Sequence, residues 1–224
     1  FDDGAFSRAV TVRAGMFGAT ATDNDGAGKG FDPSTLYRSE NDVLLYCIDL
    51  LDNLIKAPTG YDVYDLDQSE VEDSSDDGPR RDFGRMFGFL GAVNSVMGDR
   101  GYGFGDKNWL NPDPNSGWLS GAIQIGIWES LYERIGQPLG LGSGWFTAQI
   151  GSNDSRTNLH PDGNTFLNDV FTAMSFDNPP EALNAIQVKR FVPTSNLQGA
   201  PVTGQELIGD PVVDVPTPAP LLLL

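Results

Sequence analysis

The fold is decided by a short apolar stretch near the start of the chain, VLLYCIDL, which spans residues 43–50. A nearly continuous apolar run of this length is typical of a buried β-strand. Residues 9–14 alternate between apolar and polar side chains, and residues 61–64 are a further strand candidate. Residues 185–192 and 206–215 are expected to return to the same sheet. The stretch at 43–50 therefore predicts a β scaffold built from both ends of the chain.

In the middle of the chain the hydrophobic period changes and predicts three helices. Asp82 can cap the first of them, which is stopped by Gly98. The second is expected over about residues 120–134 and the third over about residues 164–174. Residues 99–117 are rich in Gly, Asn, Asp and Pro and predict a loop.

These elements together predict an α+β fold. We expect a β-rich scaffold, barrel-like or sandwich-like, with a central helical insertion. The chain would form one domain over residues 1–210, with strands up to about residue 67, helices over about 80–175 and returning strands over about 185–210. Residues 211–224 would form a proline-rich, apolar tail.

The composition limits the partners of the protein. The chain of 224 residues has 31 acidic and 14 basic residues, which gives a net charge of −17. Nucleic acid and anionic membrane surfaces should repel it. The single cysteine, Cys47, and the single histidine, His160, exclude an intramolecular disulfide and a cysteine-rich zinc site. We expect no signal peptide ahead of Phe1, and no apolar run in this sequence has the length of a transmembrane segment.

The tail ends with PTPAPLLLL at residues 216–224. This stretch resembles the start of the bacterial PEP-CTERM sorting signal, in which a Pro-Glu-Pro box precedes a membrane segment and a basic cluster. Thr217 stands where the box has its glutamate, and this sequence contains neither the membrane segment nor the basic cluster of the signal. The resemblance implies export to the bacterial envelope or the extracellular matrix. The alternative is an apolar tail that packs on its own core or on a neighbouring molecule.

The second expected helix carries a polar residue on an apolar stripe. The helix is apolar almost all the way round and should therefore be buried. Gln124 shares its stripe with Trp128 and Leu131, four and seven residues further on. A buried amide without partners costs about 1–3 kcal/mol. Either this amide is hydrogen-bonded to neighbouring backbone, or a nucleophile has converted it into another group.

Two segments together resemble the Cys-Gln thioester domains of bacterial surface proteins. Tyr46, Cys47 and Ile48 match the aromatic-Cys-aliphatic segment of that family, and IQIGIW at residues 123–128 matches its aliphatic-Gln-x-x-aliphatic-Trp segment. The two segments follow each other in the order of the family, and the resemblance covers about residues 40–175. It implies a thioester between Cys47 and the glutamine of the second segment, Gln124.

The positions of neighbouring residues suggest how they could support this pair. Tyr46 flanks the cysteine, and Trp128 would form a lid or wall beside the bond, the alternative being a core aromatic. The N–H groups of Gly121 to Ile123, expected in the first turn of the helix, could stabilise the oxyanion.

The chemistry requires these residue types. A thiolate is a strong nucleophile, and its attack on the side-chain carbonyl of Gln124 would expel ammonia and leave an Sγ–acyl bond. A lysine amine could then take the acyl group, which forms an isopeptide and frees the thiol of Cys47. Since the bond reacts only once, we do not expect an enzyme.

The expected function is covalent attachment to an amine-bearing or hydroxyl-bearing surface target, in adhesion or crosslinking. The protein would be secreted and located at a bacterial cell surface or in the extracellular matrix. The alternative is a structural subunit of an extracellular filament or layer, assembled through its C-terminal tail without thioester chemistry. Both can hold if a thioester in one copy captures a lysine of another copy. Lys29, in a glycine-rich loop, is expected to be the most accessible of the lysines, which also include Lys56, Lys107 and Lys189.

Two other kinds of site are alternatives to this pair. A Cys47–His160 hydrolase dyad is disfavoured, because His160 lies in a polar turn and neither local signature of the common cysteine proteases is present. Acidic clusters at residues 23–26 and 65–77 suggest Ca²⁺. The first lacks the glutamate at the twelfth EF-hand position, and the second has no fixed spacing and is expected to be a solvated loop. We therefore expect no metal site and no cofactor, with Ca²⁺ as the alternative.

Overall fold

The structure of the chain is a computed structural model. It describes residues 14–20, 42–50, 59–66, 71–72, 81–102, 105–110, 117–133, 136–142, 144, 146–148, 161–174, 188–196, 200–201 and 203–209.

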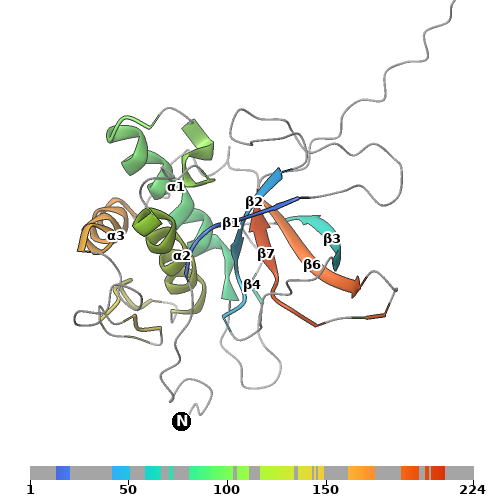
Figure 1. The fold of residues 1–224 in the computed structure, drawn as a ribbon. Helices are drawn as coiled ribbons and strands as arrows, with labels where there is room; N and C mark the ends of the chain where they lie inside the picture. Colours follow the sequence, from blue (N-terminus) through green and yellow to red (C-terminus); the bar gives the residue numbers. More distant parts are fainter. Residues whose placement is uncertain are drawn as a thin grey trace, which may run out of the picture.

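Five of the described strands form an antiparallel sheet beside a helical layer (Figure 1). Its order is β1 (Phe17–Thr20), β2 (Asp42–Cys47), β7 (Leu207–Gly209), β6 (Lys189–Asn196) and β3 (Thr59–Asp65). Two shorter strands, β4 (Val71–Glu72) and β5 (Arg81–Asp82), pair with each other. The strand that carries the cysteine, β2, thus lies between β1 and β7, inside the sheet.

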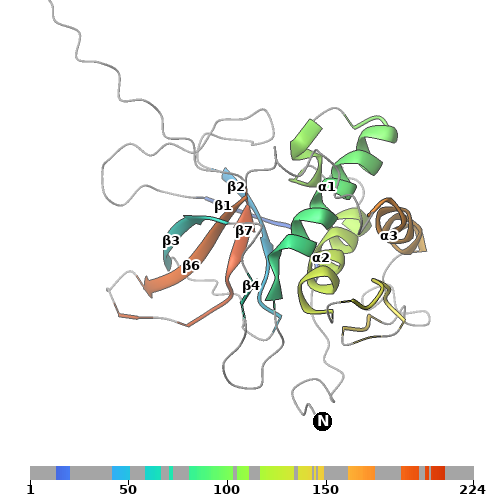
Figure 2. The ribbon, with the colours of Figure 1, turned by 180° about the vertical axis from the view of Figure 1, so that it is seen from behind.

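The helical layer comes from the middle of the chain, and the reverse view shows it on one side of the sheet (Figure 2). It consists of α1 (Phe83–Asp99), the 3₁₀-helix η1 (Gly105–Leu110), α2 (Gly117–Tyr132) and α3 (Pro161–Ala173). Asp82 caps α1 by accepting a hydrogen bond of 3.0 Å from the N–H of Arg85, as the sequence predicts. Past the end of α1 the chain turns at Gly101, whose φ of +90° favours glycine.

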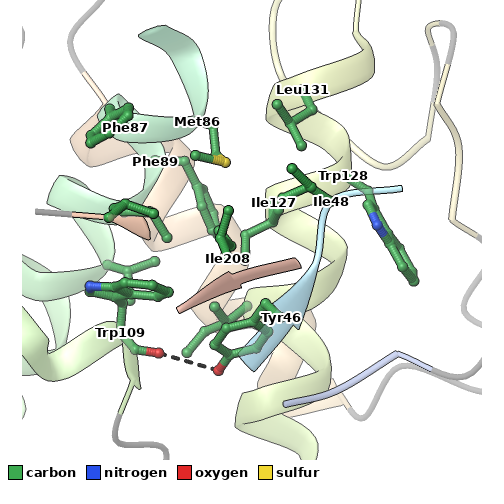
Figure 3. Close-up of a cluster of buried hydrophobic side chains, with 14 of the residues drawn as sticks. Tyr46, Ile48, Met86, Phe87, Phe89, Trp109, Ile127, Trp128, Leu131 and Ile208 are labelled. Carbon is green, nitrogen blue, oxygen red and sulfur yellow. Dashed lines mark hydrogen bonds between the residues drawn. The ribbon is translucent and has the colours of Figure 1, made fainter. Parts of the chain in front are cut away.

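Successive side chains of β2 point to opposite faces of the sheet. Tyr46 and its pairing partner Ile208 lie in the core, and the hydroxyl of Tyr46 donates to the carbonyl of Trp109 at 3.2 Å (Figure 3). Cys47 pairs with Leu207 and therefore shares the other face with it. Both pairs are buried. The strand thus contributes a core aromatic to one face of the sheet and the thiol to the other.

The α+β class and the central helical insertion are confirmed. The described sheet has β1 and β3 at its edges, so its closure into a barrel or a sandwich stays a prediction. Strand β2 ends at Cys47 rather than at residue 50, although the N–H of Ile48 still donates to the carbonyl of Glu206.

Two expected loops contain structure. The acidic stretch 65–77 includes β4, and the stretch 99–117 includes η1 and the start of α2. Trp109 and Leu110 are buried, so η1 contributes to the core, a long-range contact that turn-forming composition does not reveal. The expected strand at 9–14 lies outside the described residues except for Ala14, and the tail 211–224 lies outside them entirely.

Candidate functional site

Gln124 completes the hydrogen bonding of β2 at the point where its neighbour β1 ends. The N–H of Ile48 donates to the carbonyl of Glu206 at 3.0 Å, so the backbone groups of Cys47 point away from β7. On that other side, the pairing of β1 with β2 ends at Phe17 and Leu45. The side chain of Gln124 takes the position that a further residue of β1 would occupy. Its Oε1 accepts from the N–H of Cys47 at 2.9 Å, and its Nε2 donates to the carbonyl of Cys47 at 2.7 Å.

The buried amide therefore has partners, and they are backbone groups. Gln124 is 1% exposed, and the bonds that it makes to Cys47 fix the strand relative to α2. This is the first of the two interpretations given above. The expected pair lies together, but the contact runs through the backbone of Cys47 and not through its sulfur.

The sulfur faces a different glutamine. Cys47 Sγ donates to Oε1 of Gln205 at 2.9 Å, and Nε2 of Gln205 donates to the carbonyl of Asp49 at 2.9 Å. Gln205 stands two residues before β7 and is half-buried, whereas Cys47 is 8% exposed. The pairing of β2 with β7 brings these residues together although they are 158 positions apart.

Burial determines the protonation state of the Cys47 thiol. It raises the pKa of Cys47 to about 12, and the nearby carboxylate of Asp49 adds to the rise. The thiol is therefore neutral near pH 7 and can serve as the donor in its contact with Gln205. Burial, and to a lesser degree Cys47, also raises the pKa of Tyr61.

The segment after the cysteine is held by the same helix that holds the cysteine. Tyr132, at the end of α2, donates through its hydroxyl to the carbonyl of Ile48 at 2.7 Å and accepts from the N–H of Leu50 at 3.4 Å. Its pKa is raised by burial, so the hydroxyl keeps its proton. Helix α2 therefore contacts the chain at Cys47 through Gln124 and just beyond it through Tyr132.

The two expected supporting residues, Tyr46 and Trp128, each pack against another aromatic ring. Tyr46 packs against Trp109 with ring centroids 6.0 Å apart, on the core face of β2. Trp128 is buried, and its ring lies 6.4 Å from that of Phe146. This contact favours the interpretation of Trp128 as a core aromatic.

The expected oxyanion site at Gly121 to Ile123 is wrong. Helix α2 begins at Gly117, so these N–H groups lie beyond its first turn and belong to the hydrogen-bond ladder of the helix. The sequence pattern placed the helix start too late because Gly117 and Trp118 follow a run of loop-forming residues.

Several sequence-based candidates lie outside the described residues. They are His160, the acidic cluster 23–26, most of the cluster 65–77, Lys29 and Lys56. The side chain of Lys107 is not described either, whereas Lys189 forms an ion pair with Asp65. Within the part of the chain that the structure covers, no group of three or more His, Cys, Asp or Glu side chains could hold a metal ion. Among the described helices, none has both the length and the apolar character needed to span a bilayer.

Comparison of the chain with protein-family models, with curated proteins and with solved structures gave no match.

Gln205 is the residue that sequence reasoning missed. The available signal was GQELIG at residues 204–209, where a glutamine directly precedes an apolar strand. Nothing local connects this segment with Cys47, because the contact depends on which strands are neighbours in the sheet.

Proposed function

We propose that Cys47 forms an internal thioester and that the protein uses it once, to attach covalently to a nucleophile on its target. The observation that carries this proposal is the contact of 2.9 Å between Cys47 Sγ and Oε1 of Gln205. A sulfur in hydrogen-bond contact with an amide oxygen lies close to the carbonyl carbon that it would attack.

Gln205 is the better acyl partner in this proposal, and Gln124 is the residue that holds the strand. Both polar atoms of the Gln124 amide bond to the backbone of Cys47, and conversion to a thioester would remove its Nε2. Loss of that donor would leave a buried carbonyl without its hydrogen bond, at a cost of about 1–3 kcal/mol. Gln205 is partly exposed, and the proposal requires that an outside nucleophile reach its carbonyl.

The bond-forming step is balanced within the site. The Sγ–H bond breaks, Sγ bonds to Cδ of Gln205, the Cδ–Nε2 bond breaks, and the proton leaves with the nitrogen as ammonia. An amine later attacks Cδ, which forms an amide and returns a proton to Sγ. A hydroxyl nucleophile would give an ester by the same route. The thiol is consumed by forming the bond and is released by the single attachment, so the protein acts as a reagent and not as an enzyme.

The setting that fits this chemistry is the bacterial exterior. The tail at residues 216–224 resembles the PEP-CTERM signal, which supports export to the cell surface or the extracellular matrix. A surface protein with one reactive acyl group would act in adhesion or in crosslinking of the matrix, on an amine or hydroxyl of its partner. Copies of the same chain are included among these partners, since they carry lysines.

Intact-mass spectrometry tests the proposal. The freshly purified protein is expected to be lighter than its sequence by one ammonia and to have no free thiol when it is unfolded without a nucleophile. Methylamine should add one molecule and release one thiol. Cys47→Ser provides the control and should show the full sequence mass under both conditions. A full sequence mass for the unsubstituted protein, with one titratable thiol, would contradict the proposal.

A further inference from the structure

The residue next to Gln205 belongs to an ionic cluster that the thioester chemistry does not use. Oε2 of Glu206 accepts from Arg81 at 2.7 Å and from Arg190 at 2.8 Å. The guanidinium carbons of Arg81 and Arg190 lie 5.7 and 5.5 Å from the ring centroid of Phe83, within cation–π range. The side chains of the three charged residues are only 12–16% exposed. We refer to Arg81, Phe83, Arg190 and Glu206 as the arginine clamp.

The arginine clamp joins three parts of the fold. Arg81 belongs to β5, Phe83 begins α1, and Arg190 lies on β6. Arg190 pairs with Ile208, so it shares the helix-facing side of the sheet. Glu206, two residues before Ile208, projects to that same side. The clamp therefore fixes the start of β7 against the helical layer.

Alternation along an extended chain then determines where Gln205 points. When Glu206 is held toward the helices, its neighbour is turned to the opposite face, where Cys47 lies. The carbonyl of Glu206 also accepts from the N–H of Ile48, the residue after Cys47. Backbone and side chain of Glu206 thus fix the distance and the rotation of the segment that carries the amide of Gln205.

We propose that Glu206, through the arginine clamp, is a positioning residue that aligns the carbonyl of Gln205 with the thiol of Cys47. The proposal rests on the proposed thioester function. Small errors in the placement of a reacting group lower rates strongly, about a hundredfold for about 1 Å. A neutral side chain at position 206 keeps the size of the glutamate but cannot bind two guanidinium groups as a carboxylate does.

The test compares the ratio of thioester to free glutamine by intact mass in the soluble, folded protein. Glu206→Gln is expected to lower this ratio at least about tenfold. Glu206→Asp, which keeps the charge, is expected to recover part of it. Samples are held well below the melting temperature of each variant, so that only folded molecules are compared.

The chain offers a matched control pair. Arg100 donates to Asp169 at 2.7 Å and lies 5.2 Å from the ring centroid of Phe166, which joins α1 to α3 far along the fold from Gln205. Asp169→Asn removes the same charge from a more exposed ion pair, in which the side chains of Arg100 and Asp169 are 36% and 52% exposed, and should leave the thioester ratio unchanged. An equal ratio in Glu206→Gln and the unsubstituted protein would overturn the inference while leaving the proposed function intact. Absence of the thioester from the unsubstituted protein would overturn both.

Discussion

Cys47 contacts two glutamines, and each contact involves a different part of the residue. Gln124 binds its backbone N–H and carbonyl, whereas Gln205 accepts from its sulfur. Substitution of Gln124 is therefore expected to change the stability of the protein, whereas substitution of Gln205 is expected to change the chemistry of the thiol.

Methylamine is expected to label Gln205. After treatment of the folded protein, peptide mapping should find the added methyl group on the side-chain amide of Gln205 and leave Gln124 unmodified. Gln205→Ala should retain the fold, since this side chain is half-exposed, but should show the full mass with no ammonia lost.

Gln124→Ala gives the complementary result. It leaves two buried backbone groups of Cys47 without their partner and should destabilise the protein by about 1–3 kcal/mol or more. Gln137→Ala, at an exposed position, is the matched control for thermal melting. A methylamine label on Gln124 would contradict the assignment of roles.

The sequence predicts some of this site and not the rest. Cys47 stands in an apolar run, and Gln124 occupies a polar position on an apolar stripe, so local periodicity identifies both. Gln205 has no such signal, because it meets the sulfur only through the neighbouring positions of β2 and β7 in the sheet. Strand order is a property of the whole chain, which local pattern does not encode.

At the scale of elements, α1 and α2 pack closely where α2 lacks a side chain. A Cβ on Gly126 would lie 2.0 Å from Cζ of Phe89 on α1 and 2.9 Å from Cδ2 of Leu167 on α3. The start of α1 is easier to predict than such contacts, because the cap at Asp82 depends only on the adjacent residues. The packing of α1 and α3 against Gly126 of α2 depends on how the three helices lie relative to one another, which the residues next to Gly126 in the sequence do not indicate.

Gly126→Ala is expected to lower the free energy of unfolding by about 1–3 kcal/mol through overpacking. Gly88→Ala is the matched control on α1, because its Cβ would make an ordinary contact of 3.5 Å with Cε of Met174. That variant should be neutral or stabilising, since alanine favours a helix interior over glycine by up to about 1 kcal/mol. Urea unfolding measures both, and equal midpoints for the two variants would count against this packing.

At the scale of the whole molecule, one buried acid links stability to pH. Glu129 of α2 is fully buried, and its Oε1 accepts from the N–H of Gly140 at 2.6 Å. Burial raises its pKa from 4.5 to about 7. The hydrogen bond from Gly140 lowers this pKa, Glu133 raises it, and Arg85 lowers it. The folded protein therefore holds this proton more tightly than the unfolded chain does.

Protonation of Glu129 contributes to the free energy of unfolding. This contribution is fully present below about pH 4.5, where Glu129 is protonated in both the folded and the unfolded chain, and it falls as the pH rises to about 7. Glu129→Gln removes this dependence while keeping an acceptor for Gly140. The stability of Glu129→Gln relative to the unsubstituted protein should thus rise between pH 5 and pH 8, by on the order of 1–3 kcal/mol. Asp62→Asn, which replaces a carboxylate at an exposed position, is the control. Thermal melting of both variants and the unsubstituted protein across this pH range tests the prediction. The prediction is refuted if the stability of Glu129→Gln and that of Asp62→Asn vary with pH in the same way.

The adjacency of β2 and β7 has a mechanical consequence. Cys47 and Gln205 are 158 positions apart, and α1, α2 and α3 all lie between them in the chain. A covalent link at this point would carry tension from one terminus to the other directly across the sheet, so the helices would bear none of the load. A proteolytic nick anywhere in the enclosed segment would likewise leave the two fragments joined until an amine opened the link.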